Sequence, residues 1–376
     1  MAKLIGNAPN QVPTNADLGS MAFEDKKNYA TTSSPIYQPY RNIIINGDMS
    51  IAQRGTSSSG ITSSGYYTID RMKTVINGSL GTWTQTQSTD VPTGEGFRSS
   101  LKMDCTTADA SPSAGDYLLV GQSFEGQMLQ YLKKGTSSAE SLTASFWVKS
   151  NKTGTYTCVF REFNNNRGIS KSYTINSANT WEKKIITFEG DTTGVLSNNN
   201  LQSLQLQFWL GAGSSFSSGT LATSWESRVD ANVAVGQVNL ADNTANEWYI
   251  TGVQLEAGTT ASDFEFLPYD VNLNRCQRYF ELTQPNYFIV SRYNTSLSYG
   301  LLTEYKTAKR TTPSIARQDG ASTVDAHGAG QVGYTTVAFS PTGINVNGSA
   351  TNVTTGATYD TSFCGLSSPL EIDAEL

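Results

Sequence analysis

Two segments of the chain alternate apolar and polar residues with a period of two. Their apolar positions are Leu142, Ala144, Phe146 and Val148 in the first segment, and Leu204, Leu206, Phe208 and Leu210 in the second. Successive side chains of a β-strand point to opposite faces of the sheet, so each segment predicts a strand with one apolar face. No long stretch shows sustained helical periodicity. We therefore expect an all-β fold.

Further strand signals recur throughout residues 41–268. Runs rich in β-branched and aromatic residues are separated by clusters of Gly, Ser, Asn and Thr, which favour turns. The expected additional strands cover residues 156–163, 171–175, 181–188 and 248–255. Several strands joined by irregular loops predict a jelly-roll β-sandwich over residues 41–268.

Residues 1–40 form a polar segment that contains Pro9, Pro13, Pro35 and Pro39 and has too little apolar area to fold alone. One interpretation is a disordered tail, because chain termini are often loose unless they dock. The alternative is an extended arm that becomes ordered against a partner. Its apolar side chains would then be the anchoring residues, namely Leu4, Ile5, Leu18, Met21 and Phe23.

The sequence changes character near Pro268. Residues 272–281 place Leu273, Cys276, Tyr279 and Phe280 at helical spacing and predict a short helix. Short strands are expected at residues 287–290, 298–305, 332–339 and 343–346. Residues 269–376 therefore predict a smaller C-terminal β domain, which ends in an acidic tail at residues 371–376.

The charge and hydropathy of the chain argue against two classes of function. The net charge is -6 and the isoelectric point is about 5.0, without the basic footprint that nucleic-acid binding usually leaves. No apolar run approaches the roughly 20 residues that a membrane-spanning helix needs. The first residues also lack the apolar stretch of a secretory signal, so we expect no signal peptide.

The cysteines and the histidine give little support to metal or triad chemistry. Cys105, Cys158, Cys276 and Cys364 are far apart and form no CxxC pair, so we expect buried free thiols and not a zinc site. The single histidine, His327, lies in a loop of small residues, which weakens a Ser-His-Asp hypothesis.

Several motifs resemble those of structural proteins from marine tailed bacteriophages of the cyanophage type. Residues 5–19 (IGNAPNQVPTNADLG) resemble an N-terminal virion anchor. Residues 42–49 (NIIINGDM), 53–55 (QRG) and 67–72 (YTIDRM) resemble the start of a jelly-roll domain of phage tail fibres. Residues 252–258 (GVQLEAG) and 264–269 (FEFLPY) match its end, and residues 276–280 (CQRYF) and 373–376 (DAEL) are similar to the C-terminal module that often follows.

This resemblance implies a structural virion protein, located in the phage tail and made in the host cytoplasm. It implies a homotrimer that binds other virion proteins through the arm, and a tail fibre that attaches to host cell-surface polysaccharide. A second hypothesis is a head or tail decoration or connector protein without receptor binding. A third is a polysaccharide depolymerase. The jelly-roll part also resembles carbohydrate-binding modules, in which sugar rings stack on aromatic side chains.

The candidate sugar-contacting residues lie on the polar faces of the two alternating segments. If the leucines of residues 204–210 face the core, Gln205, Gln207 and Trp209 point outward together. A tryptophan beside two glutamines suits ring stacking combined with hydrogen bonds to hydroxyls. A second outward set is Thr143, Ser145, Trp147 and Lys149. There are two competing interpretations: a face packed against a neighbouring subunit, and a polar face with a partly buried tryptophan.

Asp48, in Asn46-Gly47-Asp48, is a weak candidate ligand for a structural Ca²⁺, because calcium prefers oxygen donors. The commoner interpretation of this sequence is a tight turn, since Asn and Gly accept a positive φ. No consensus calcium loop is present, and we expect no other cofactor.

Catalysis has little support in the sequence. Glycosidases need two carboxylates at a defined separation, and no pattern pairs any two of the acids at Asp116, Glu125, Asp230, Asp242, Glu247 and Glu256. A phosphate-binding glycine motif is also absent. We therefore expect a binding protein and not an enzyme.

Overall fold

A computed structural model describes residues 40–283, 288–293, 296–317, 323–326, 330–333, 336–339, 343–350, 364–365 and 369–376. The chain divides into two compact units, Met1–Arg41 and Asn42–Leu376. The five predicted anchoring residues and His327 lie outside the described residues.

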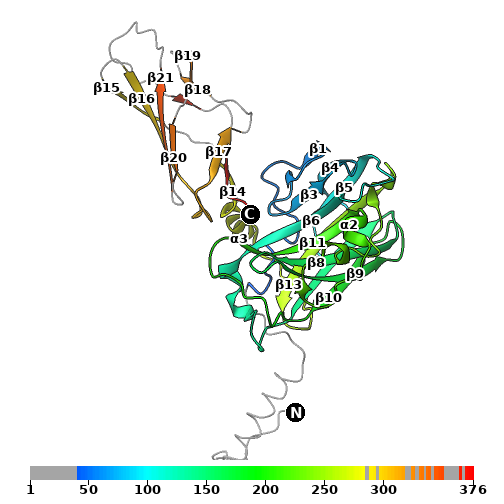
Figure 1. The fold of residues 1–376 in the computed structure, drawn as a ribbon. Coiled ribbons are helices and arrows are strands. Elements are labelled where there is room, and N and C mark those ends of the chain that lie inside the picture. Colours follow the sequence, from blue (N-terminus) through cyan, green and yellow to red (C-terminus); the bar gives the residue numbers. More distant parts are fainter. Residues whose placement is uncertain are drawn as a thin grey trace, which may run out of the picture. The chain divides into compact units, whose positions relative to one another are not determined.

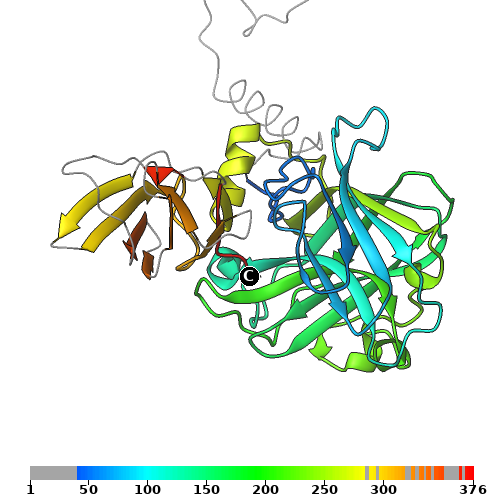
Figure 2. The same ribbon diagram turned by 90° about the horizontal axis from the view of Figure 1, so that it is seen from above.

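Two antiparallel sheets form a sandwich in the unit that begins at Asn42, and its strands are coloured blue to yellow-green in Figure 1. Sheet A has six strands in the order β1 (Ser57–Ile61), β4 (Thr82–Ser88), β5 (Ser100–Thr107), β13 (Glu247–Ala257), β7 (Leu142–Ser150) and β10 (Glu182–Phe188). Sheet B has seven strands in the order β12 (Glu226–Ser227), β9 (Arg167–Ile175), β8 (Gly154–Glu162), β11 (Gln202–Ala212), β6 (Tyr117–Glu125), β3 (Lys73–Asn77) and β2 (Gly65–Tyr66). The predicted all-β jelly-roll sandwich is confirmed, and Figure 2 gives a second view of its layers.

The core lies between the inner faces of the two sheets. All eight apolar residues of the two alternating segments are buried in one cluster, together with Trp83 and Trp248. Phe146 of β7 and Phe208 of β11 meet edge to face, with ring centroids 4.9 Å apart, so the core joins sheet A to sheet B directly. The predicted inward faces of both strands are therefore confirmed.

Short helical turns occupy several connections of the sandwich. They are η1 (Gly126–Leu132), α2 (Ser214–Ser217), η2 (Asp230–Asn232) and η3 (Leu240–Asp242). Where the structure describes the chain, no helix has both the length and the apolar character needed to cross a membrane.

Helix α3 (Tyr269–Gln277) begins directly after Pro268 and confirms the predicted short helix, although it ends earlier than expected. It buries Cys276, and the turn that follows buries Tyr279, against Ile45 and Ile51 from the start of the sandwich. The last two residues of the predicted helix, Phe280 and Glu281, instead begin strand β14.

Among the described C-terminal residues there are three further sheets. One has three strands in the order β14 (Phe280–Thr283), β23 (Leu370–Asp373) and β17 (Ser314–Arg317). The second joins β15 (Phe288–Tyr293), β16 (Ser296–Glu304), β21 (Gly343–Ala350) and β20 (Thr336–Phe339), and the third joins β19 (Gly330–Gly333), β18 (Thr323–Ala326) and β22 (Cys364–Gly365). The single strand expected at residues 332–339 is thus two strands, and the expected acidic tail contributes a central strand.

Three of the four cysteines behave as predicted. Cys105, Cys158 and Cys276 are buried free thiols. Burial raises the pKa of each thiol, so these sulfurs stay protonated and unreactive near neutral pH. The side chain of Cys364 lies outside the described residues.

Candidate functional site

The first predicted sugar-contacting set points away from the core, as expected, but it is not accessible. Gln205 is 5% exposed, Gln207 3% and Trp209 1%. Their polar groups bond to one another, because Trp209 Nε1 donates to Gln207 Oε1 at 3.1 Å and Gln207 Nε2 donates to Gln205 Oε1 at 2.7 Å. In this arrangement none of the three side chains is open to a sugar, and sugar contact by them stays a prediction.

A connection of the sandwich covers this face of sheet B. Trp209 packs in a second apolar cluster with Val233 and Ala234, which lie just after η2. The rings of Tyr117 and Phe216 lie with their centroids 5.3 and 5.6 Å from that of Trp209. The indole therefore stabilises the packing of α2 and η2 on the sheet, and a ligand cannot reach it in this arrangement.

Trp147 occupies the outer face of sheet A, the face opposite the core, and is half-buried. Its register partners are Lys183 on β10 and Thr251 on β13. Two other members of the second predicted set, Thr143 and Ser145, are buried, and Thr143 Oγ1 donates to the carbonyl of Gly258 at 2.8 Å. Of the four residues predicted to contact sugar, only Trp147 retains solvent access.

The structure adds two aromatic residues to this face, Trp181 and Tyr249, that the sequence pattern did not indicate. Trp181, half-buried, precedes β10, and Tyr249 lies on β13, with their ring centroids 6.1 Å apart in an edge-to-face contact. Lys149 Nζ lies 4.3 Å from the centroid of Tyr249 and 5.6 Å from that of Trp181, as in cation–π contacts. Period-two spacing places Trp181 on the same face as Lys183, and this alternation is the sequence signal that could have identified Trp181.

Asp90 holds this aromatic group from the connection between β4 and β5. Trp181 Nε1 donates to Asp90 Oδ1 at 2.9 Å, and Lys149 forms an ion pair with the other carboxylate oxygen. Partial burial alone would raise the pKa of Asp90, but the hydrogen bonds from Lys149 and Trp181 outweigh it and lower that pKa. The orientation of the Trp181 indole is therefore fixed before any ligand arrives.

A second charged group lies beside Tyr249. Lys102 of β5 pairs with Glu247 and lies 3.6 Å from Asp104, while the Tyr249 hydroxyl donates to Glu247 at 3.0 Å. Burial, together with the hydrogen bond to Glu247, raises the pKa of Tyr249 to about 12. The phenol therefore remains a neutral donor across the physiological pH range.

The remaining outward side chains of β10 are open to solvent. Lys183 is exposed and has no ion-pair partner among the residues that the structure describes. Ile185, two positions further along β10, is 57% exposed. We define the outer face of sheet A as the set Asp90, Lys102, Asp104, Trp147, Lys149, Trp181, Lys183, Ile185, Glu247 and Tyr249.

The Asn46-Gly47-Asp48 segment is a turn, in agreement with the commoner interpretation. Asn46 has a φ of 63°, and its side chain bonds to Ile51 at both its oxygen and its nitrogen. Asp48 Oδ1 accepts hydrogen bonds from Ser50 Oγ and Asn272 Nδ2 at 3.1 Å each, and burial raises the pKa of this carboxyl.

Calcium binding at Asp48 remains a prediction. Within the described ranges, no cluster of three His, Cys, Asp or Glu residues is arranged to hold a metal.

The acids considered for catalysis are engaged in the structure. Glu125 forms a bidentate pair with Arg278, and Asp242 pairs with Lys152. The structure does bring one pair of carboxylates together, because Glu247 of β13 and Asp104 of β5 are register partners on the outer face of sheet A. Both contact Lys102.

Comparison with known proteins finds no matching family model and no matching curated protein. Among solved structures, the chain is similar to the enzymatically active domain of tailspike protein 4 of bacteriophage CBA120, with 14% identity and a TM-score of 0.30 over 58% of this chain and 22% of that one. It is similar to a putative sugar binding protein from Bacteroides thetaiotaomicron, with 13% identity and a TM-score of 0.31 over 57% and 99%. It is also similar to the family 11 carbohydrate-binding module of a Clostridium thermocellum cellulase, with 11% identity and a TM-score of 0.25 over 58% and 96%. These scores support no argument about function, which therefore rests on the side chains of this chain.

Proposed function

We propose that this protein is a carbohydrate-binding protein and that the outer face of sheet A is its binding surface. The observation that supports this most is the placement of Trp147 and Trp181, two half-buried indoles on one sheet face among polar side chains. A sugar ring has an apolar face and a rim of hydroxyls, so it fits an aromatic side chain bordered by hydrogen-bonding groups.

The polar groups on this face supply both donors and acceptors. Lys183 lies beside Trp147 across the strand pair, and Asp90 is exposed beside Trp181. A hydroxyl that loses water without gaining a partner costs about 1–3 kcal/mol, so these groups would select among sugars. The Trp181–Asp90 and Lys149–Asp90 contacts hold part of the surface in place, which reduces the entropy cost of binding.

The finer role that we propose is attachment of a phage tail fibre to host cell-surface polysaccharide. The support is the sequence resemblance of residues 42–72 and 252–269 to phage fibre domains. A homotrimer, as that resemblance implies, would carry three weak sites and gain avidity without new contacts. Under this proposal residues 1–40 would bind other virion proteins.

The proposal is tested by affinity electrophoresis of the purified protein in gels that contain extracted host surface polysaccharide. We expect retardation that Trp147→Ala and Trp181→Ala each reduce. The control is Tyr131→Ala, because Tyr131 is an aromatic residue of η1 that is 52% exposed and lies outside the outer face of sheet A. Equal retardation of all four proteins would contradict the assignment of this surface.

One observation favours polysaccharide cleavage as a second candidate. Asp104 and Glu247 are adjacent carboxylates on the same face as the indoles. Glycoside hydrolysis uses two such groups, one as acid and one as nucleophile or base. Release of reducing ends from the polysaccharide, abolished by Glu247→Gln or Asp104→Asn, would establish it. Binding without release would leave the non-catalytic proposal.

A further inference from the structure

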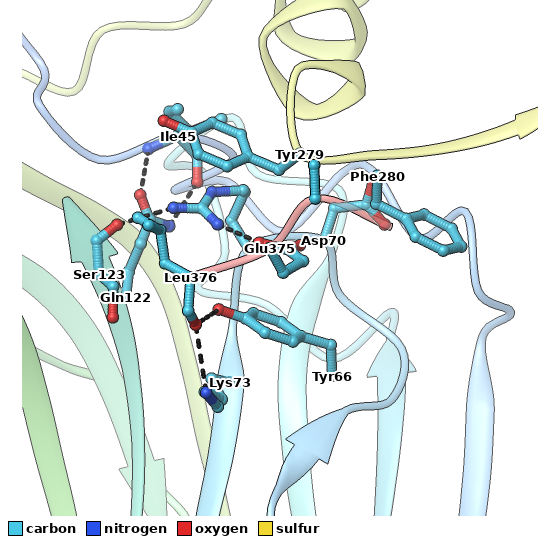
Figure 3. A network of polar contacts seen from close by, with 12 residues as sticks. Ile45, Tyr66, Asp70, Lys73, Gln122, Ser123, Tyr279, Phe280, Glu375 and Leu376 are labelled. Atoms are coloured by element: carbon cyan, nitrogen blue, oxygen red, sulfur yellow. Dashed lines mark hydrogen bonds and ion pairs between the residues drawn. The ribbon is translucent and has the colours of Figure 1, made fainter. Parts of the chain in front are cut away.

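Four of the sequence motifs that resemble phage fibre proteins meet at one place outside the outer face of sheet A. Arg54 belongs to the QRG motif, Arg71 to YTIDRM, and Tyr279 to CQRYF, while Glu375 belongs to the final DAEL. Figure 3 shows Tyr279, Glu375 and Leu376 gathered around this point. We call the group formed by Arg54, Tyr66, Arg71, Lys73, Tyr279, Phe280 and Arg310 the socket.

Arg71 is the centre of the socket. Its side chain is 1% exposed, and its φ of 70° is rare for a residue with a side chain. Its guanidinium carbon lies 3.5 Å from the ring centroid of Tyr279, its Nη2 donates to the carbonyl of Ser123 at 2.7 Å, and its Nη1 pairs with Glu375. A strained, buried cation is therefore matched to one acidic side chain of the C-terminal segment.

Arg54 contacts the same C-terminal segment. Its guanidinium lies 3.4 Å from the ring centroid of Phe280, and it pairs with Asp373 at 3.1 Å and Glu375 at 3.5 Å. Two arginines on the sandwich thus contact two acidic residues that are two positions apart.

The main chain of the segment is held as well. Tyr66 Oη and Lys73 Nζ donate to the carbonyl of Leu376 at 2.9 and 3.1 Å (Figure 3). Arg310 donates to the carbonyls of Ala374 at 2.8 Å and Glu375 at 2.9 Å. These contacts depend on the backbone and not on side-chain identity, so they fix the position of the segment along the socket.

The residues that precede these main-chain contacts form strand β23, which lies between two other strands. β23 pairs with β14 on one side and β17 on the other, and Leu370 is the register partner of both Thr283 and Arg317. The chain therefore leaves the three-stranded sheet of β14, β23 and β17 after Arg317. It returns to this sheet at Leu370, at the same end. The contacts described here do not require residues 318–369 to hold the segment.

We propose that β14, β17 and the socket form a docking site for an acidic β-strand, and that residues 370–376 occupy this site as a peptide ligand would. Insertion of a strand supplies main-chain hydrogen bonds, and the arginine contacts supply selection for acidic side chains at Asp373 and Glu375. The covalent link through residues 318–369 raises the local concentration of the segment but is not what holds it.

The test cuts this link in the folded, full-length protein. A protease recognition sequence is inserted between Ser367 and Ser368, the purified protein is cleaved, and the mixture is passed through a gel-filtration column. We expect the released C-terminal peptide to elute with the body of the protein, as detected by native mass spectrometry.

Two variants of equal charge change make the test specific. Glu375→Gln removes the partner of Arg71, and we expect the peptide to dissociate at least about tenfold faster, since hydrogen bonds to charged groups are among the stronger ones. Glu371→Gln is the matched control, because Glu371 is in the same segment but forms no ion pair in the part of the chain that the structure describes. Its dissociation rate should equal that of the unchanged peptide.

Two results would overturn the proposal. One is immediate loss of the unchanged peptide after cleavage, which would show that the link and not the site holds it. The other is equal dissociation of the Glu375→Gln and Glu371→Gln peptides, which would show that the socket does not select acidic side chains at this position.

Discussion

Gly47 lies where a side chain would meet the backbone of a neighbouring strand. A Cβ atom at this position would lie 2.0 Å from the carbonyl oxygen of Val253, whose amide donates to the carbonyl of Gly47 at 2.9 Å. The Asn46-Gly47-Asp48 turn therefore requires glycine because of this close approach and not because of its φ.

Gly47→Ala should destabilise the protein, because the backbone of β13 must move to accept the methyl group. Overpacking of this kind costs about 1–3 kcal/mol. Thermal unfolding would measure the effect, with Gly115→Ala as control, since a Cβ at Gly115 meets nothing within 4 Å. A Gly47→Ala protein as stable as the control would contradict the contact.

Lys134 is a buried cation with a weak partner. Its Nζ lies 3.5 Å from the ring centroid of Trp225 and 3.9 Å from Asp191, and its side chain is 3% exposed. Burial lowers the pKa of Lys134 to about 8, and the charge of Asp191 offsets this only in part. Lys134 is therefore still mostly charged at neutral pH, but it loses its proton at a lower pH in the folded protein than in the unfolded chain.

The sign of the resulting pH dependence follows from proton binding. Between about pH 8 and the ordinary lysine pKa of about 10.4, the unfolded chain binds a proton that the folded chain has lost, so Lys134 makes stability rise with pH there. Lys134→Met removes this contribution. The free energy of unfolding of the variant minus that of the unchanged protein should fall across this window in urea titrations. A constant difference would contradict the assignment.

At the scale of elements, alternation predicted which faces of β7 and β11 form the core, because a period of two determines the face of each side chain. It did not predict what covers the other face. Trp209 is covered by residues near Val233, and that contact joins segments too far apart in sequence for a local pattern to reveal it. The role of residues 370–373 as a central strand was missed for the same reason, since their partners are Phe280–Thr283 and Ser314–Arg317.

One buried ion pair joins strand β14 to the connection before β17. Lys309 Nζ lies 2.5 Å from Glu281 Oε2, and both side chains are 0% exposed. Lys309 also donates to the carbonyl of Gln277, at the end of α3. The pair therefore couples the three-stranded sheet of β14, β23 and β17 to helix α3, which packs on the sandwich.

Removing one member of this pair should cost more than removing both. Lys309→Met leaves the Glu281 carboxylate buried without its cation, which typically costs about 3–5 kcal/mol, whereas a double change to Lys309→Met and Glu281→Leu removes both charges. Urea unfolding of the two variants would measure the difference. If the double variant is instead less stable than the single variant, the expected cost of leaving Glu281 without its cation is contradicted.

At the scale of the whole molecule, the sequence indicated the fold class and one accessible residue of the candidate site, Trp147. It did not indicate Trp181, Tyr249 and Asp90 as a group, because Asp90 reaches them from a connection between other strands. The arm, the homotrimer and the virion location remain predictions from resemblance. The proposed glycan surface and the docked C-terminal segment involve different residues, so each can fail without the other.

The proposed function requires that the outer face of sheet A bind glycan through its two indoles. Calorimetric titration of the protein with a host surface oligosaccharide, repeated with a Trp147→Ala and Trp181→Ala double variant, tests it most directly. We predict saturable binding by the unchanged protein and none by the double variant, with both proteins unfolding at similar temperatures. Undiminished binding by the folded double variant would contradict the claim.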